Sequence, residues 1–84
     1  MKLCDVNLFF ENVDPDIDVD LIHKTFVDND MDAIIALGNI YEGKLGINVS
    51  CYSDNIDESA MKAIHIAEEI IGEGKLSKVT SGLS

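Results

Sequence analysis

Apolar and polar residues alternate in two stretches of the chain, which predicts two half-buried β-strands. The first stretch runs from Cys4 to about Phe10, and the second covers residues 45–53. A period of two places successive side chains on opposite faces of a sheet. Residues 33–41 are rich in β-forming side chains, and the Glu-Gly-Lys sequence at 42–44 predicts a tight turn that joins them to 45–53 as a hairpin.

Two further stretches have the apolar spacing of amphipathic helices. The first is expected to begin after Asp18, a good N-terminal cap, and to end near Asn29. The second follows Asn55, and Glu58 three residues later resembles a capping box. It is expected to run to about Glu73, with Gly74 as its C-terminal cap. The predicted apolar faces comprise Val19, Ile22 and Phe26 in the first helix, and Ala60, Ala63, Ile64, Ala67, Ile70 and Ile71 in the second, with Ile66 on the polar side.

The order of these elements predicts an α+β fold. Strand, helix, two strands and helix, with a short edge strand at 75–80, fit a ferredoxin-like β-α-β-β-α(-β) sandwich. In that sandwich an antiparallel sheet has both helices on one face. Residues 1–80 are expected to form a single acidic domain, and residues 81–84 a loose C-terminal tail.

The same fold makes the first and third strands antiparallel neighbours, and one register satisfies every inward position. It places Cys4 opposite Cys51. The other inward pairs are Val6–Val49, Leu8–Ile47 and Phe10–Leu45. On the outward face, Phe9 lies over Gly46 and Glu11 opposes Lys44. We therefore predict two free, buried thiols at 4 and 51, in contact with the second helix near Ile64 or Ala67.

The net charge limits the possible binding partners of this protein more than any sequence motif does. The 84 residues include 16 acidic residues against six lysines, with no arginine, for a net charge of −10. Residues 1–32 carry nine of the acids and only two lysines. This field disfavours direct contact with nucleic acid or anionic membranes, and it favours basic protein surfaces or cations, although acidity also simply maintains solubility. The lack of a secretion signal or membrane-spanning run predicts a cytoplasmic location.

The predicted topology places the acids at both ends of the sandwich. The loop at 14–20 lies at one end with Glu42 and Glu73, and the loop at 28–32 lies at the other end beside residues 54–58. The candidate partner-binding residues are Asp14, Asp16, Asp18, Asp20, Asp28, Asp30, Asp32, Asp54, Asp57 and Glu58.

Motifs for metal binding and catalysis fail at their decisive positions. A calcium loop starting at Asp14 would need glycine and glutamate where the chain has Val19 and Thr25. Neither cysteine nor either histidine has zinc-ligand spacing, and no phosphate loop or activated nucleophile is present. We therefore expect no defined metal site, no cofactor and no enzymatic activity, while a weak, looser site for a hard cation in the acidic loops stays open as an alternative.

Two hypotheses for function follow. The first is a small acidic protein-binding module that engages a basic surface of a partner, such as a nucleic-acid-binding protein, and acts as a nucleic-acid mimic or inhibitor. The alternative is a small-ligand or divalent-cation-binding regulatory domain that forms a homodimer through its open sheet face. The candidate dimer or contact face comprises Leu3, Phe9 and Tyr52.

Overall fold

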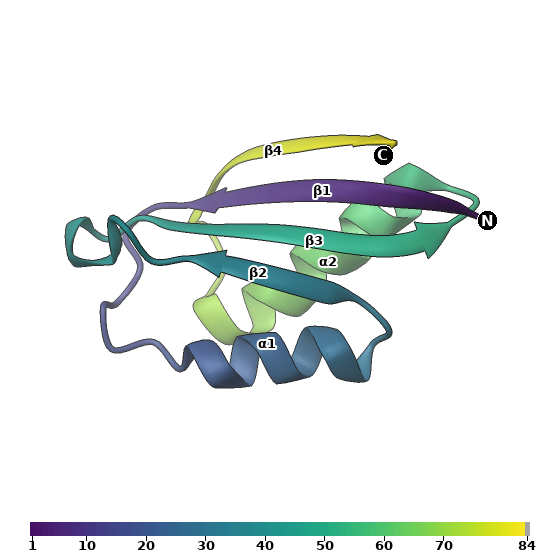
Figure 1. Ribbon diagram of the computed structural model, residues 1–84. Helices are drawn as coiled ribbons and strands as arrows, with labels where there is room; N and C mark the ends of the chain where they lie inside the picture. The colour runs from purple at the N-terminus through teal and green to yellow at the C-terminus, as the bar shows by residue number, and fades with distance from the viewer. Residues whose placement is uncertain (84) are drawn as a thin grey trace.

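Four antiparallel strands and two helices form the α+β fold of the computed structural model, which describes residues 1–83. Figure 1 shows both helices on one side of the sheet, while the other side is open. The elements are β1 (Lys2–Phe10), α1 (Val19–Asp28), β2 (Asp32–Ala36), a 3₁₀ turn (Ile40–Glu42), β3 (Leu45–Ser53), α2 (Ile56–Ile71) and β4 (Leu76–Leu83).

The predicted register of β1 and β3 is confirmed along the whole ladder. Cys4 faces Cys51, Phe9 faces Gly46, and the pairing runs from Lys2 with Ser53 to Phe10 with Leu45. The sheet order is β2-β3-β1-β4, so these two strands occupy its centre. Their inward side chains are buried because both neighbouring strands and both helices surround them.

The core is a single cluster between the sheet and the helices. Its largest fully buried side chains include Phe10, Phe26, Leu8, Ile22 and Ile47. Burying one such side chain stabilises the fold by about 1.5–3 kcal/mol. The helices contribute through a narrow apolar stripe, and α2 meets the sheet with small residues, Ala63 and Ala67. Small side chains let this helix lie close to the strands.

Helix α1 begins where the sequence predicts. The Asp18 side chain accepts a hydrogen bond from the Leu21 amide at 3.0 Å, which satisfies one of the free donors of the first turn. The helix ends at Asp28, and the Met31 amide then donates to the Phe26 carbonyl at 2.9 Å. Asp30 has a left-handed backbone with φ of 59°, a conformation that aspartate tolerates better than most residues.

Helix α2 starts at the predicted cap, but its details differ from the prediction. Asn55 accepts hydrogen bonds from the amides of Asp57 and Glu58. The return bond of a capping box is replaced, because the Asn55 amide donates to the Ser53 Oγ at 3.0 Å. The helix ends at Ile71, and Gly72, with φ of 110°, is its cap in place of Gly74.

The buried face of α2 is also rotated relative to the prediction. Ile66 was expected on the polar side, but only 6% of its surface is exposed. It lies three residues after Ala63 and so shares that side of the helix. Ile64, expected on the apolar face, is only partly buried. The apolar pattern alone could not fix this rotation, because isoleucines occupy both flanks of the stripe.

The connection between β2 and β3 is longer than a tight turn. Strand β2 ends at Ala36, so residues 37–41 do not continue the strand as predicted. The chain instead forms a 3₁₀ turn that buries Ile40, and Gly43 closes it in the left-handed region with φ of 78°. The Gly43 carbonyl accepts from the Val13 amide at 2.9 Å, which ties this tip to the loop after β1.

The fourth strand is longer than predicted and includes part of the expected tail. Strand β4 pairs with β1 from Phe10 with Leu76 to Cys4 with Leu83, so residues 81–83 belong to the sheet. Ser84 lies outside the described residues. The ladder between β1 and β3 ends at Phe10, and the amide of Glu11 bonds instead to the Lys75 carbonyl at 2.8 Å. The expected cross-strand pair of Glu11 with Lys44 is therefore outside the ladder.

We predict that Cys4 and Cys51 react slowly with thiol reagents in the native protein. Both are free and buried, so labelling requires the sheet to open. Both should react promptly in denaturant, and mass spectrometry after timed labelling would measure the two rates. Rapid labelling of both native thiols would contradict the register. A disulfide between them would preserve the register but contradict a reducing compartment.

The rotation of α2 is tested by Ile66→Ala, which should lower the free energy of unfolding by about 2–4 kcal/mol because it leaves a cavity against the sheet. Met61→Ala is the matched control, since Met61 is 67% exposed on the same helix. That variant should change stability by less than about 0.5 kcal/mol. Urea denaturation followed by circular dichroism would measure both, and equal effects would refute the observed rotation.

Candidate functional site

All ten acidic residues predicted to contact a partner have exposed side chains. At one end of the molecule, the loop after β1 presents Asp14, Asp16 and Asp18. The Asp14 carboxylate accepts from the Asp16 amide at 2.9 Å, and Asp18 caps α1. Two bonds hold this loop beside its neighbours: Val13 to the β2–β3 connection and Glu11 to the segment before β4. The predicted acidic pole is therefore built on an ordered loop.

Helix α1 joins this pole to the second one. Asp20, Lys24 and Asp28 are spaced four residues apart and exposed, so they follow one another along the outer side of the helix. The helix has 10 residues and is about 15 Å long at 1.5 Å per residue. We call the resulting surface the acidic ridge. It comprises Asp14, Asp16, Asp18, Asp20, Asp28 and Asp30.

The second pole combines residues that are far apart in sequence. Asp30 and Glu58 line one shallow depression of about 340 Å³, together with Lys62 and Met1. Asp54 lies near it and forms an ion pair with the N-terminal amine at 3.3 Å. Lys62 and the amine offset part of the negative charge here. This pole is therefore less strongly negative than its count of acids suggests.

Asp32 lies at the edge of the sheet, at the margin of this second pole. It is the first residue of β2 and pairs with Ser50 in the register that places alternate residues on the open face. It lines a depression at the edge of the sheet with Leu3 and Tyr52, and Asp30 and Val27 line the same depression. The start of β2 therefore places Asp32 at the border between the open face and the α1–β2 loop, where it still shares a depression with Asp30.

The acidic ridge is not neutralised by the chain's own cations. Within residues 1–83 the ion pairs are Asp54 with the N-terminus and His65 with Glu69 at 3.2 Å. Neither involves a ridge carboxylate. Lys24, which lies on the same helix, forms no ion pair within that range either. The ridge therefore presents its charge to solvent.

The predicted contact face of Leu3, Phe9 and Tyr52 is divided in two. Leu3 and Tyr52 are direct cross-strand partners, but Phe9 is six residues further along β1, which is about 20 Å. The face between them is polar on β1 and β3, whereas Ile34 of β2, opposite Asn48, is 72% exposed in the same row. Asn48 donates to the Asn7 side-chain oxygen at 2.8 Å, and Ser50 donates to the Asp5 carboxylate at 2.8 Å.

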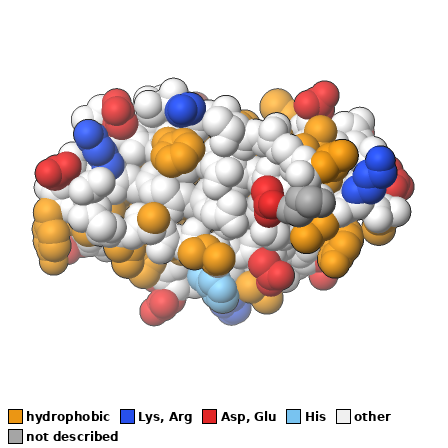
Figure 2. All heavy atoms as spheres, turned by 45° about the horizontal axis from the view of Figure 1, so that its top comes forward, with side chains coloured by type: hydrophobic (Ala, Val, Ile, Leu, Met, Phe, Trp, Pro, Cys, Tyr) orange, Lys and Arg blue, Asp and Glu red, His pale blue; other side chains and the backbone are white. Residues whose placement is uncertain are grey.

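In Figure 2, apolar side chains are frequent toward the two ends, and the surface between them consists mostly of backbone and of side chains that are neither apolar nor charged. Tyr52 is 68% exposed at one end, and Phe9 is 44% exposed at the other. The three side chains therefore do not form one continuous patch, and a contact face that includes all three stays a prediction. The alternation of apolar and polar residues correctly predicted that all three residues lie on one face. It does not predict how far apart they lie along the strands.

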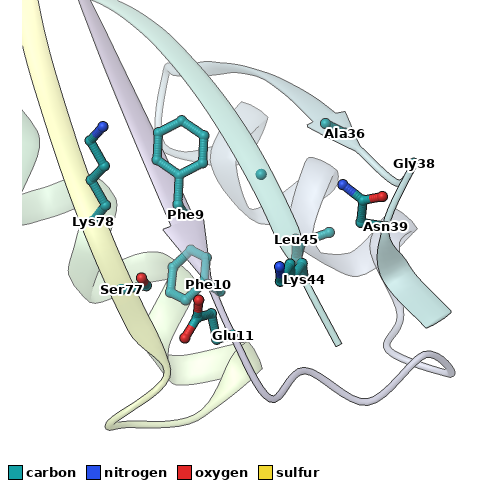
Figure 3. A pocket seen from close by; sticks show the side chains of 11 residues that line it. Phe9, Phe10, Glu11, Ala36, Gly38, Asn39, Lys44, Leu45, Ser77 and Lys78 are labelled. Atoms are coloured by element: carbon teal, nitrogen blue, oxygen red, sulfur yellow. The ribbon is translucent and has the colours of Figure 1, made fainter. Parts of the chain in front are cut away.

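The Phe9 end contains a depression of about 480 Å³ that sequence analysis did not identify as a site. Figure 3 shows Phe9 and Lys78 projecting side by side from β1 and β4, with Asn39 and Ala36 on the far side. The lining residues are Phe9, Phe10, Glu11, Ala36, Gly38, Asn39, Lys44, Leu45, Gly46, Ser77 and Lys78. The pairing of Phe9 with Gly46 was the sequence signal for it, because glycine leaves the flank of the ring open.

Comparison with known proteins gives no relative for this chain: no family model, curated protein or solved structure matches it. Neither helix within residues 1–83 has the length and apolar character needed to cross a bilayer. In the same range, no three histidine, cysteine or acidic residues are grouped so that they could hold a metal ion. Function must therefore be inferred from the surfaces of the chain itself.

The structural role of Asp18 can be separated from its charge. Asp18→Ala should destabilise the protein by about 1 kcal/mol, because the Leu21 amide loses its acceptor, whereas Asp18→Asn should retain most of the stability. Asp16→Ala is the control, since the Asp16 side chain caps nothing. Thermal and urea unfolding would measure all three. Equal losses for Asp18→Ala and Asp18→Asn would mean that charge, rather than the cap, stabilises the helix.

Proposed function

We propose that this protein is a small acidic binding module that places its acidic ridge against a basic surface of a partner protein. The observation that supports this most directly is the lack of ion pairs to the ridge within residues 1–83. Carboxylates that form no ion pair within the fold remain available to an external cation, and Lys24 is the one lysine in the row of Asp20 and Asp28. Such charges accelerate encounter and select a partner of opposite sign.

The surface around the ridge also suits a protein partner. Leu21 and Val27 are each 47% exposed on α1, and they flank the row formed by Asp20, Lys24 and Asp28. Protein interfaces commonly combine an apolar centre with a polar, charged rim. If the partner's basic surface normally binds the phosphates of a nucleic acid, the carboxylates of the ridge would occupy the same positions. The module would then act as a nucleic-acid mimic or inhibitor.

The proposed role is binding rather than catalysis, and the proposed location is the cytoplasm. The acidic side chains lie open to solvent along a helix instead of converging in an enclosed cleft. Two buried free thiols suit a reducing compartment. We also infer that the fold is of the ferredoxin-like kind, which the sheet order β2-β3-β1-β4 and the positions of the two helices support.

Dimerisation through the open sheet face is less well supported. The hydrogen-bonded pair of Asn7 and Asn48 occupies the middle of that face and would have to be covered together with the two separated apolar patches. The small-ligand alternative has one observation in its favour, the depression beside Phe9. No observation favours a divalent cation as the ligand.

The proposal predicts that Asp28→Asn with Asp30→Asn weakens partner capture, while Glu68→Gln with Glu69→Gln does not. Both double variants remove two negative charges, but only the first lies on the ridge. Asparagine also tolerates the left-handed backbone of Asp30. At about 0.2–1 kcal/mol per exposed pair, the first variant should bind about 2- to 30-fold more weakly.

The measurement begins with capture from lysate by the immobilised protein, at about 50 mM and about 500 mM NaCl, which screen charge to different extents. Each retained protein would then be purified and its Kd measured for the wild type and both variants. We expect basic proteins that are released by salt. Retention that ignores salt, or equal weakening by both double variants, would contradict a binding site on the ridge.

A further inference from the structure

The depression beside Phe9 has the opposite electrostatic character to the rest of the molecule. Two of the six lysines, Lys44 and Lys78, line it, against a single acid, Glu11. Neither lysine forms an ion pair within residues 1–83. The protein has a net charge of −10, so two uncompensated lysines at one apolar depression mark a locally cationic site on an otherwise anionic surface.

The shape of the depression suits a flat molecule. Gly46 lies directly opposite Phe9, and a Cβ added at Gly46 would lie 3.5 Å from the Ala36 Cβ. The missing side chain therefore leaves a floor of backbone and one methyl group. The Phe9 ring forms one wall, and Asn39 lies across from it in Figure 3. The volume of about 480 Å³ is within the usual range for small-molecule sites.

We propose that this depression binds a planar organic anion. The ring system would rest on Gly46 and Ala36 with its edge or face against Phe9, and the anionic group would reach the lysines at the rim. Lys78 already places its Nζ 5.9 Å from the centre of the Phe9 ring. That geometry holds a positive charge beside the aromatic wall, where it can contact an anion bound next to the ring. Charge complementarity selects an anion over a neutral or cationic molecule of the same shape.

This site is separate from the acidic ridge. It lies on the open face near the β2–β3 connection, whereas the ridge follows α1 on the helical side. The two proposals require ligands of opposite charge. A failure of one therefore leaves the other standing.

The test uses naphthoate as the probe and naphthalenemethanol as its neutral counterpart, with binding followed in proton–nitrogen correlation spectra. We expect saturable shifts at the amides of 9, 38–39, 44–46 and 77–78. A Kd of about 1 mM or tighter is reasonable for a ligand of this size. The neutral compound should bind about two- to fivefold more weakly. Equal affinity for the two compounds, or shifts spread over the whole surface, would overturn the proposal.

Variants then locate the site. Gly46→Val should reduce naphthoate affinity at least tenfold by filling the floor, and valine is well suited to a strand. Lys78→Gln should weaken it two- to fivefold, and Lys24→Gln on α1 is the matched control that should leave it unchanged. Dispersed spectra would show that each variant folds. If Gly46→Val failed to fold, the effect of Lys78→Gln against Lys24→Gln would decide, and equal values for those two would refute the site.

Discussion

The pairing of β1 with β3 is the interaction on which the rest of the structure depends. It sets four apolar residues of each strand on the same side of the sheet, and these meet α1 and α2 as a single core. A slip of one residue would turn Cys4, Val6 and Leu8 toward solvent and bury Asp5 and Asn7. The burial of charge and the loss of apolar contact both oppose that slip. The register is therefore fixed by the core.

The same register organises the open face. Residues that point away from the core meet in rows across the strands, and the middle rows hold the hydrogen bonds of Asn7 with Asn48 and Asp5 with Ser50. These bonds satisfy polar side chains where no helix covers them. They also separate the apolar patch of Leu3 and Tyr52 from Phe9. The open face thus has an apolar surface at each end, and its middle row combines the Asn7–Asn48 pair with the exposed Ile34.

Acidic and basic side chains also lie on different surfaces of the protein. The six acids of the ridge form no ion pair within residues 1–83, and two of the six lysines line the depression beside Phe9 instead. Asp18 contributes both to the ridge and to helix stability, since its carboxylate caps α1. An acidic loop in this protein therefore has a structural function at one residue and exposes charge at the others.

The sequence by itself determined the elements, the central register and the exposure of the acids. Alternation in β1 and β3 left one arrangement in which all inward pairs are apolar, and Asp18 and Asn55 are side chains whose local bonds start a helix. Only the tertiary structure decided the end of β2, the rotation of α2 that buries Ile66, and the inclusion of residues 81–83 in β4. It also decided that Asp32 begins the edge strand opposite Ser50 and that Lys44 and Lys78 approach Phe9. These features depend on contacts between residues far apart in the chain. The local pattern of apolar and polar residues carries no information about such contacts.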